Sequence, residues 1–286
     1  MRSSSGMPDG EDSSRTALVT GAATGIGLAI VRVLAEQGWR VLGTALPGQA
    51  TPAIDASLGV QFLEVDLADE ASRQHLIGRL AREHRLDAVV SNAGIAVPAP
   101  LEVAPLDELR RQFEINTIAP IMLARALLPR LRDVRGRLIF IGAGQGRVAL
   151  PFGGPYAASK AALAAMTDSL RAEIADTGVT VSLIEPGAIR TAILEESRVR
   201  ASMLLDELPD EMAGRYRRPL EATFARSEKA FRRASAPQRI AHLIAGILES
   251  PAPKPRYLIG RDAVALAFVA HLPARWRARL VARLMT

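Results

Sequence analysis

The chain has 286 residues, of which 49% are hydrophobic and 23% charged, an ordinary composition for a globular protein of one large domain or two small ones. It contains no cysteine, so disulfides, thiolate metal sites and cysteine nucleophiles are excluded. The net charge of +6 is concentrated late in the chain without a recognised nucleic-acid motif, so we interpret it as a solvated face and expect no nucleic-acid partner. The four histidines lack the spacing of metal ligands, and we predict no metal site: His75, His84, His242 and His271.

Residues 1–14 are polar and acidic, and we expect a disordered leader there rather than a secretory signal. The longest strongly apolar segment covers residues 263–272 and is too short to span a bilayer. These features predict a cytoplasmic protein, or at most a peripheral one.

From residue 15 to about 185, short apolar runs alternate with amphipathic helical patterns. This alternation favours a parallel sheet with helices on both faces, an α/β, Rossmann-like, doubly wound fold in a single domain. The predicted strands cover 17–19, 41–42, 61–65, 88–90, 138–141 and 179–184, and the predicted helices cover 28–37, 70–83, 107–131 and 156–176.

Over residues 192–237 the alternation of strand and helix patterns stops. This segment predicts a helical insertion beside the ligand crevice at the carboxyl ends of the strands. The domain then continues to residue 262 with a helix over 240–248 and a final edge strand over 256–260. We interpret the insertion as a substrate lid whose apolar face suits an apolar substrate, while packing against the body or a partner subunit explains that face equally well. The apolar residues are Met203, Leu204, Leu205, Leu208, Met212 and Phe224.

The C-terminal extension, residues 263–286, is apolar at first and then amphipathic and rich in arginine around Trp276. Such a helix can lie on an anionic membrane surface. Packing on its own domain or across a subunit interface is the commoner role, and we favour it here.

The segment from Thr20 to Gly27, TGAATGIG, lies between the first strand and the first helix. Glycines in this position permit a tight turn and close approach of a pyrophosphate, and the helix N-terminus offers N–H groups to an anion. Gly21, Gly25 and Gly27 therefore predict a dinucleotide-binding turn.

Tyr156 and Lys160 are four residues apart and share one face of a predicted helix. A nearby ammonium favours the phenolate of a tyrosine and lowers its pKa from about 10. The pair is a candidate proton donor and acceptor, although alone it is also an ordinary pair on a helix surface.

Six motifs in order and spacing make residues 15–192 resemble the short-chain dehydrogenase/reductase family. They are TGAATGIG, Asp66 in LEVDL, Asn92-Ala93-Gly94, Asn116, Tyr156 with Lys160, and the residues 186–191. The segments VALPFGGPYAASK and IEPG resemble the hydroxysteroid and retinol dehydrogenase branches.

The resemblance implies that Tyr156 exchanges a proton with the substrate oxygen while a hydride moves to or from a nicotinamide. It implies that Lys160 lowers the Tyr156 pKa and holds the ribose hydroxyls, and that Asn116 helps order a water chain to Lys160. Asp66 would bind the adenine amino group or cap a helix, and Asn92 would steady neighbouring strands. The full implied cofactor set is Gly21, Gly25, Ile26, Gly27, Asp66, Leu67, Asn92, Ala93, Gly94, Tyr156, Lys160, Pro186, Gly187, Ile189 and Thr191.

Ala143 stands 13 residues before Tyr156, where family members commonly have the serine that completes the catalytic set. A methyl group cannot donate a hydrogen bond to the substrate oxygen, which by analogy with a lost oxyanion donor costs about 10²–10³ in rate. Three explanations stay open. Gln145 supplies an amide donor, or Tyr156 works alone on an easy substrate, or the fold serves binding or regulation or carries an engineered alanine.

Cofactor choice is weakly specified, because Ala45 and Leu46 provide neither an aspartate for a ribose hydroxyl nor an arginine for a phosphate. We expect NAD(H) or NADP(H), with a slight preference for NAD(H).

The predicted function is interconversion of an apolar secondary or allylic alcohol and its carbonyl. The alternative is an impaired, dinucleotide-dependent binding or regulatory protein. We expect a homodimer or homotetramer through the helices that carry Asn116 and Tyr156.

Overall fold

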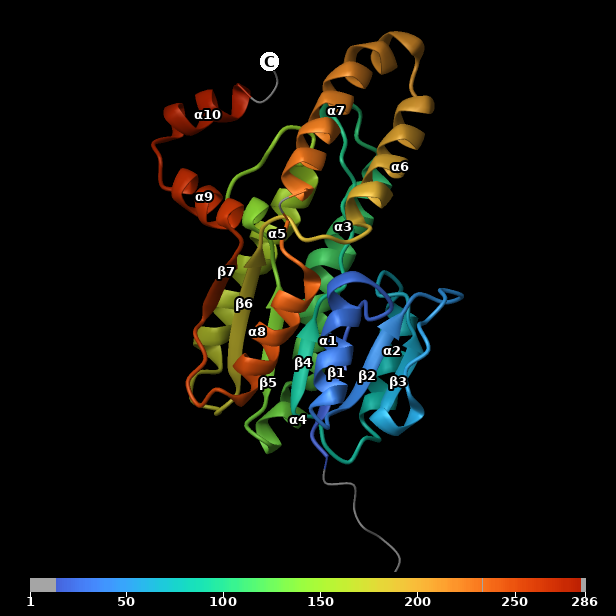
Figure 1. Cartoon of the computed structure of the whole chain (residues 1–286), viewed down its shortest axis with the longest axis vertical. Coiled ribbons are helices and arrows are strands. Elements are labelled where there is room, and N and C mark those ends of the chain that lie inside the picture. Colours follow the sequence, from blue (N-terminus) through green and yellow to red (C-terminus); the bar gives the residue numbers. More distant parts are fainter. Residues whose placement is uncertain (1–13, 233, 284–286) are drawn as a thin grey trace, which may run out of the picture.

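The computed structural model describes residues 14–232 and 234–283. Within them the centre is a parallel sheet of seven strands in the order β3-β2-β1-β4-β5-β6-β7 (Figure 1). The order runs outward from β1 in both directions, which confirms the predicted doubly wound, Rossmann-like fold, with β7 at one edge as expected. The strands are β1 Thr16–Val19, β2 Arg40–Ala45, β3 Val60–Glu64, β4 Ala88–Ser91, β5 Arg137–Ile141, β6 Thr180–Pro186 and β7 Arg256–Ile259.

The core lies on both faces of the sheet because successive strand residues point to opposite sides. In β1, Ala17 and Val19 pack in the cluster formed with α1 and α8, whereas Leu18 packs in the cluster formed with α2, α4 and α5. The central strands are buried on both faces, which explains their continuous apolar runs. The helices are α1 Gly25–Glu36, α8 Pro237–Glu249, α2 Glu70–Leu80, α4 Ala119–Asp133 and α5 Gly154–Glu173.

The single helix predicted over 107–131 is observed in three consecutive parts. These are α3 Leu106–Phe113, the π-helical turn η3 Glu114–Ile118, and α4. A π-turn inserts one extra residue into the helical ladder, and such turns occur mostly at functional positions. Short 3₁₀ turns complete the connections: η1 Ala56–Leu58, η2 Leu101–Val103 and η4 Gly144–Gly146.

The insertion forms two helices, α6 Ile193–Asp206 and α7 Asp210–Phe231, which rise as a pair above the carboxyl ends of the strands (Figure 1). Its two ends meet in a bridge between Ile189 and Ser235. Most of the expected apolar face packs inside the insertion: Leu205 and Phe224 are buried in a cluster that also contains Phe152 of the main domain. Met203, by contrast, is 61% exposed. Packing thus accounts for much of the apolar pattern.

The described part of the C-terminal extension contains two helices, α9 Arg261–Ala270 and α10 Ala274–Ala282, and the first begins two residues before the predicted boundary at 263. The break falls at Pro273, which lacks an N–H and directs the chain into a new helix. The expected leader, residues 1–14, lies outside the described residues except for Ser14. No helix in the described ranges is both long and apolar enough to cross a bilayer. Those ranges also contain no cluster of His, Asp and Glu that could hold a metal ion.

Candidate active site

The helix α5 packs against η4, the turn that follows β5, and carries the two residues of the proposed proton-transfer pair. Pro155 occupies the first turn, where its missing N–H costs no helical hydrogen bond. Tyr156 follows it, and Lys160 lies one turn further along the same face. The Lys160 ammonium is buried and donates a hydrogen bond to the carbonyl oxygen of Ile141, at 2.9 Å. The end of β5 therefore fixes the position of the lysine.

Asn116 lies in the π-turn and is held by three hydrogen bonds. Its Oδ1 accepts from the backbone N–H of Ile95 and its Nδ2 donates to the Ile95 carbonyl, both at 2.9 Å. Nδ2 also donates to Oγ of Ser159, at 3.0 Å. A Cβ on Gly94 would stand 3.1 Å from Asn116 Oδ1 and 3.3 Å from Lys160 Nζ. Gly94 therefore allows the amide and the ammonium to approach each other beside the loop that follows β4.

The pKa values of the pair are set by burial. Surrounding protein raises the pKa of Tyr156 to about 12, although part of this residue still reaches the surface. Burial also lowers the pKa of Lys160 to about 8. The expected lowering of the Tyr156 pKa by Lys160 is therefore not what the structure shows. Desolvation dominates at the phenol, and the ammonium is directed to the Ile141 carbonyl.

Ala143 is the second residue after the end of β5 and has an extended backbone and a buried methyl side chain. Two residues on, the Gln145 side chain lies against Gly153, with Oε1 at 3.4 Å from where a Cβ would stand. Gly153 is the N-cap residue of α5, three positions before Tyr156. The Gln145 amide thus lies at the amino-terminal end of α5, and Gln145 stays a candidate for the replacement donor.

The glycine turn has the conformation that a phosphate site needs. Gly21 and Gly25 have φ values of +62° and +55°, a region that favours glycine. A Cβ on Gly27 would stand 2.1 Å from the Gly21 carbonyl oxygen, so the turn closes only with glycine there. Thr24 precedes α1 without a side-chain cap, and the first turn has no acidic residue, so its N–H groups suit an anion.

Several sequence-predicted cofactor residues meet at this turn. Asn92 Nδ2 donates to the carbonyls of Thr20 and Gly21, at 2.9 and 3.1 Å, and so joins β4 to the turn. A Cβ on Gly25 would stand 3.1 Å from Thr191 Cγ2, which places the loop after β6 against the turn.

Asp66 is further along the crevice, after β3, beside the implied cofactor residue Leu67. The expectation that Asp66 caps a helix is wrong, because Asp69 is the N-cap of α2 and accepts from the Ser72 N–H at 2.7 Å. Asp66 Oδ1 instead accepts from the Ala68 N–H at 2.9 Å.

The loop 186–191 is held from two sides by residues that the motifs did not identify. On one side, the Arg190 N–H donates to the Ser235 carbonyl, at 3.1 Å, where the lid insertion returns to the body. On the other, Asp262 of α9 accepts from the Ala188 N–H at 2.5 Å. A Cβ on Gly187 would stand 2.0 Å from an Asp262 carboxylate oxygen, so this glycine makes room for it. An aspartate in the first turn of a helix has no distinctive sequence signal.

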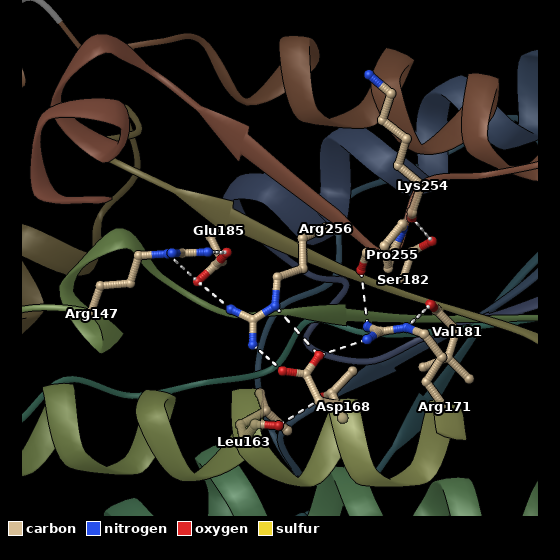
Figure 2. A network of polar contacts seen from close by, with 11 residues as sticks. Arg147, Leu163, Asp168, Arg171, Val181, Ser182, Glu185, Lys254, Pro255 and Arg256 are labelled. Atoms are coloured by element: carbon tan, nitrogen blue, oxygen red, sulfur yellow. Dashed lines mark hydrogen bonds and ion pairs between the residues drawn. The ribbon is translucent and has the colours of Figure 1, made fainter. Parts of the chain in front are cut away.

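A second unpredicted feature is a polar network between α5, β6, β7 and the segment after η4 (Figure 2). Glu185 in β6, only 2% exposed, accepts two hydrogen bonds from Arg147, at 2.9 and 2.6 Å, in the loop after η4. Arg256 of β7 joins Glu185 to Asp168 of α5, and Arg171 also binds Asp168, at 2.6 Å. Despite partial burial, the hydrogen bonds from these two arginines hold the pKa of Asp168 below its usual value. The network ties the loop that carries Ala143 to β6, β7 and the catalytic helix.

A glycine turn at the end of β1 and a tyrosine-lysine pair on α5, both on a doubly wound sheet, define a Rossmann-type oxidoreductase. Residues 15–201 match the short chain dehydrogenase family. The chain belongs to the short-chain dehydrogenase/reductase family, and it is an NAD(P)-dependent oxidoreductase.

Relatives and solved structures agree with this assignment. A 3-amino-tetrahydro-pyrrolizinone reductase from Xenorhabdus hominickii is 34% identical over 253 residues, covering 87% of this chain and 88% of that protein. Retinol dehydrogenase 5 from Mus musculus is 30% identical over 269 residues, covering 90% of this chain and 84% of that protein. The crystal structure of a short-chain dehydrogenase from Streptomyces avermitilis superposes with a TM-score of 0.74 at 27% identity, covering 94% of this chain and 96% of that one.

Structural neighbours hold either nicotinamide cofactor. A 4-hydroxyisoleucine dehydrogenase complexed with NADH has a TM-score of 0.71 at 21% identity, covering 88% of this chain and 99% of its own. A Burkholderia cenocepacia short chain dehydrogenase in complex with NADP also has a TM-score of 0.71, at 24% identity, covering 96% of this chain and 99% of its own. In this chain Ala45 and Leu46, at the end of β2, offer neither an acidic nor a basic side chain to a ribose, so the cofactor preference stays a prediction.

Proposed function

We propose that the protein reduces the carbonyl group of an apolar substrate, or oxidises the corresponding secondary or allylic alcohol. A bound nicotinamide dinucleotide supplies or accepts the hydride. Tyr156 transfers the proton to or from the substrate oxygen, Lys160 carries the charge beside it, and Asn116 holds the loop after β4 against the lysine. The observation that supports this most strongly is the convergence of Asn116 Oδ1 and Lys160 Nζ on Gly94, with Tyr156 one helical turn before Lys160 on α5.

The cofactor fits the residues present. The uncapped first turn of α1 would hold the phosphates, and Ile189 and Thr191 would hold the nicotinamide end, as the family resemblance implies. We propose NAD(H) over NADP(H) by a small margin, since Ala45 and Leu46 offer no cation to a ribose phosphate.

The lid supports an apolar substrate. Ser197 of α6 donates to the Ala96 carbonyl at 3.2 Å, and Tyr216 of α7 donates to Glu102, so the insertion spans from the β6 side to the segment after β4. Its inner cluster includes Phe152, four residues before Tyr156. We infer that the insertion excludes water from the reacting carbon and surrounds it with apolar side chains.

The raised pKa of Tyr156 keeps its phenol protonated at physiological pH, the form that can donate a proton to a carbonyl oxygen. With a pKa of about 12, only about 10⁻⁵ of Tyr156 is phenolate at pH 7, so it is well populated as a proton donor and scarce as a base. We expect kcat/KM for reduction to stay level below pH 8 and to fall above it, because Lys160, with a lowered pKa of about 8, then loses the charge that stabilises the phenolate left by proton donation.

The pH profile is measured from pH 6 to pH 10 with wild type and Lys160→Arg. Arginine keeps its charge throughout, so any activity of the variant should lack the descending limb. A wild-type profile without a descending limb up to pH 10 would show that the Lys160 charge does not support the reaction.

A second function, dinucleotide-dependent binding or regulation, is favoured by one observation, the methyl group at Ala143 where a hydrogen-bond donor is expected. Turnover with a panel of steroid, retinoid and aliphatic alcohols and ketones separates the two functions. We expect turnover of at least one apolar carbonyl compound. Binding of NAD(H) or NADP(H) without turnover of any member would favour the regulatory function.

We also propose a homodimer or homotetramer through the helices that bear Asn116 and Tyr156. Ile118 at the end of the π-turn and Met166 of α5 are exposed large apolar residues on these elements, as expected of an interface between subunits.

A further inference from the structure

The two C-terminal helices differ in how they are held. Ala263 of α9 is fully buried against Gly144 of η4, where a Cβ on that glycine would lie 3.1 Å from the Ala263 Cα. None of the nine residues of α10 is buried. Figure 1 shows α10 at the end of the chain, beyond α9 and at the same end of the molecule as the lid helices. The expected packing on the chain's own domain therefore holds for the start of α9, whereas α10 is left uncovered.

Both helices expose large apolar side chains in pairs. Val264 and Phe268 of α9 are 55% and 73% exposed, and Trp276 and Leu280 of α10 are 53% and 42% exposed. Residues four apart lie on the same face of a helix, so each pair forms a short apolar stripe. Four large apolar side chains exposed within two consecutive helices are unusual on the surface of a protein that has no partner there.

The charge around these stripes has one sign. From Ala263 to Arg283 the chain has no Asp or Glu and contains four arginines. The guanidinium groups of Arg275 and Arg279 lie 5.9 and 5.8 Å from the centre of the Trp276 ring. Arg277 instead donates to the carbonyl of Ala270, at 3.2 Å, and so ties α10 to the end of α9. The two helices α9 and α10 together form a helical hairpin. On its second helix the Trp276 indole lies between two arginines, and Arg277 fixes that helix to the first.

We propose that the α9–α10 hairpin docks on an anionic lipid surface. Indole rings lie at the boundary between headgroups and acyl chains, and arginines can extend from there to lipid phosphates. A second copy of the chain fits less well. A two-fold interface would bring the same patch on both subunits together, and within 263–283 no carboxylate is available to pair with the arginines.

The helix α9, which carries part of this surface, begins against the loops of the candidate active site. Asp262 and Ala263, at the start of α9, contact Ala188 of the loop 186–191 and Gly144 of η4. Docking would turn the lid end of the molecule towards the lipid, where apolar compounds dissolve. The docking itself does not depend on the proposed reaction, since lipid binding is measured without turnover.

The test is co-sedimentation of the full-length protein with vesicles of phosphatidylcholine, with or without about 30% phosphatidylserine. The first variant is Arg275→Glu with Arg279→Glu, and its control is Arg32→Glu with Arg82→Glu, which makes the same charge change at exposed arginines of α1 and of the segment after α2. The second variant is Trp276→Ser. Circular dichroism and the elution volume in gel filtration confirm the fold and oligomeric state of each.

We expect wild type and the control to bind the anionic vesicles and not the neutral ones, with at least tenfold weaker partitioning of the first variant. Binding should also weaken as salt is raised, and Trp276→Ser should lower it at every salt concentration. Absence of binding to anionic vesicles, or equal loss in the control pair, would overturn the proposal. So would a Trp276→Ser protein that dissociates into smaller oligomers while its lipid binding is unchanged, because the face would then be a subunit interface.

Discussion

Replacing Tyr156 with phenylalanine is expected to lower kcat by about 10²–10⁴, the usual contribution of a general acid or base. The change removes only the hydroxyl and keeps the ring packed at the start of α5. Cofactor affinity should therefore stay within a few-fold of wild type, since the glycine turn and Lys160 are untouched. Steady-state kinetics with a responsive substrate, together with a fluorescence titration of NADH or NADPH, measure both quantities.

The matched control is Tyr257→Phe, because this tyrosine of β7 donates no proton in the proposed reaction and its hydroxyl only accepts from the Lys254 N–H, at 2.7 Å. Unchanged turnover in Tyr156→Phe would assign proton transfer to another group. Loss of cofactor affinity in the same variant would instead assign the tyrosine a binding role.

Ala143→Ser is expected to raise turnover by at least tenfold, within the about 10²–10³ that one oxyanion donor contributes. Ala143 has an extended backbone at the end of β5, two residues after the Ile141 carbonyl that holds Lys160. A serine there adds one hydroxyl to the position from which a donor is expected to reach the substrate oxygen. Initial rates at saturating cofactor measure the gain.

Gln145→Ala decides whether that role is already filled. If the Gln145 amide is the replacement donor, this change lowers the wild-type rate and Ala143→Ser adds little to wild type. Ala149→Ser, at an exposed position of the following segment, controls for the mere addition of a hydroxyl. No gain from Ala143→Ser, with no loss from Gln145→Ala, would show that Tyr156 alone provides the necessary hydrogen bond.

Most of the sheet was predictable because buried parallel strands have a strong local signature. The run 138–141, for example, is observed as β5, and 256–260 as the edge strand β7. The glycine turn was also predictable, since Gly21 and Gly25 adopt positive φ and Gly27 has no room for a Cβ. These features depend on neighbours in the sequence, which a pattern can represent.

Features that depend on distant contacts were not predictable. The π-turn at Asn116 is stabilised by Ile95 and Ser159, which come from other elements. The raised pKa of Tyr156 arises from the protein packed around it, whereas the spacing to Lys160 alone suggested a lowered one. Asp262 reaches the loop 186–191 only because β7 brings it there, 74 residues further along the chain.

Transfer of deuterium from NADH or NADPH that is deuterated at both hydrogens of the nicotinamide C4 to the carbonyl carbon of a substrate is the most direct test of the proposed reaction. Mass spectrometry of the alcohol formed should show one deuterium at that carbon with the wild-type protein, and only a trace of product with Tyr156→Phe. If the labelled cofactor binds but no compound of the panel gains deuterium, the protein does not perform the proposed hydride transfer on those substrates.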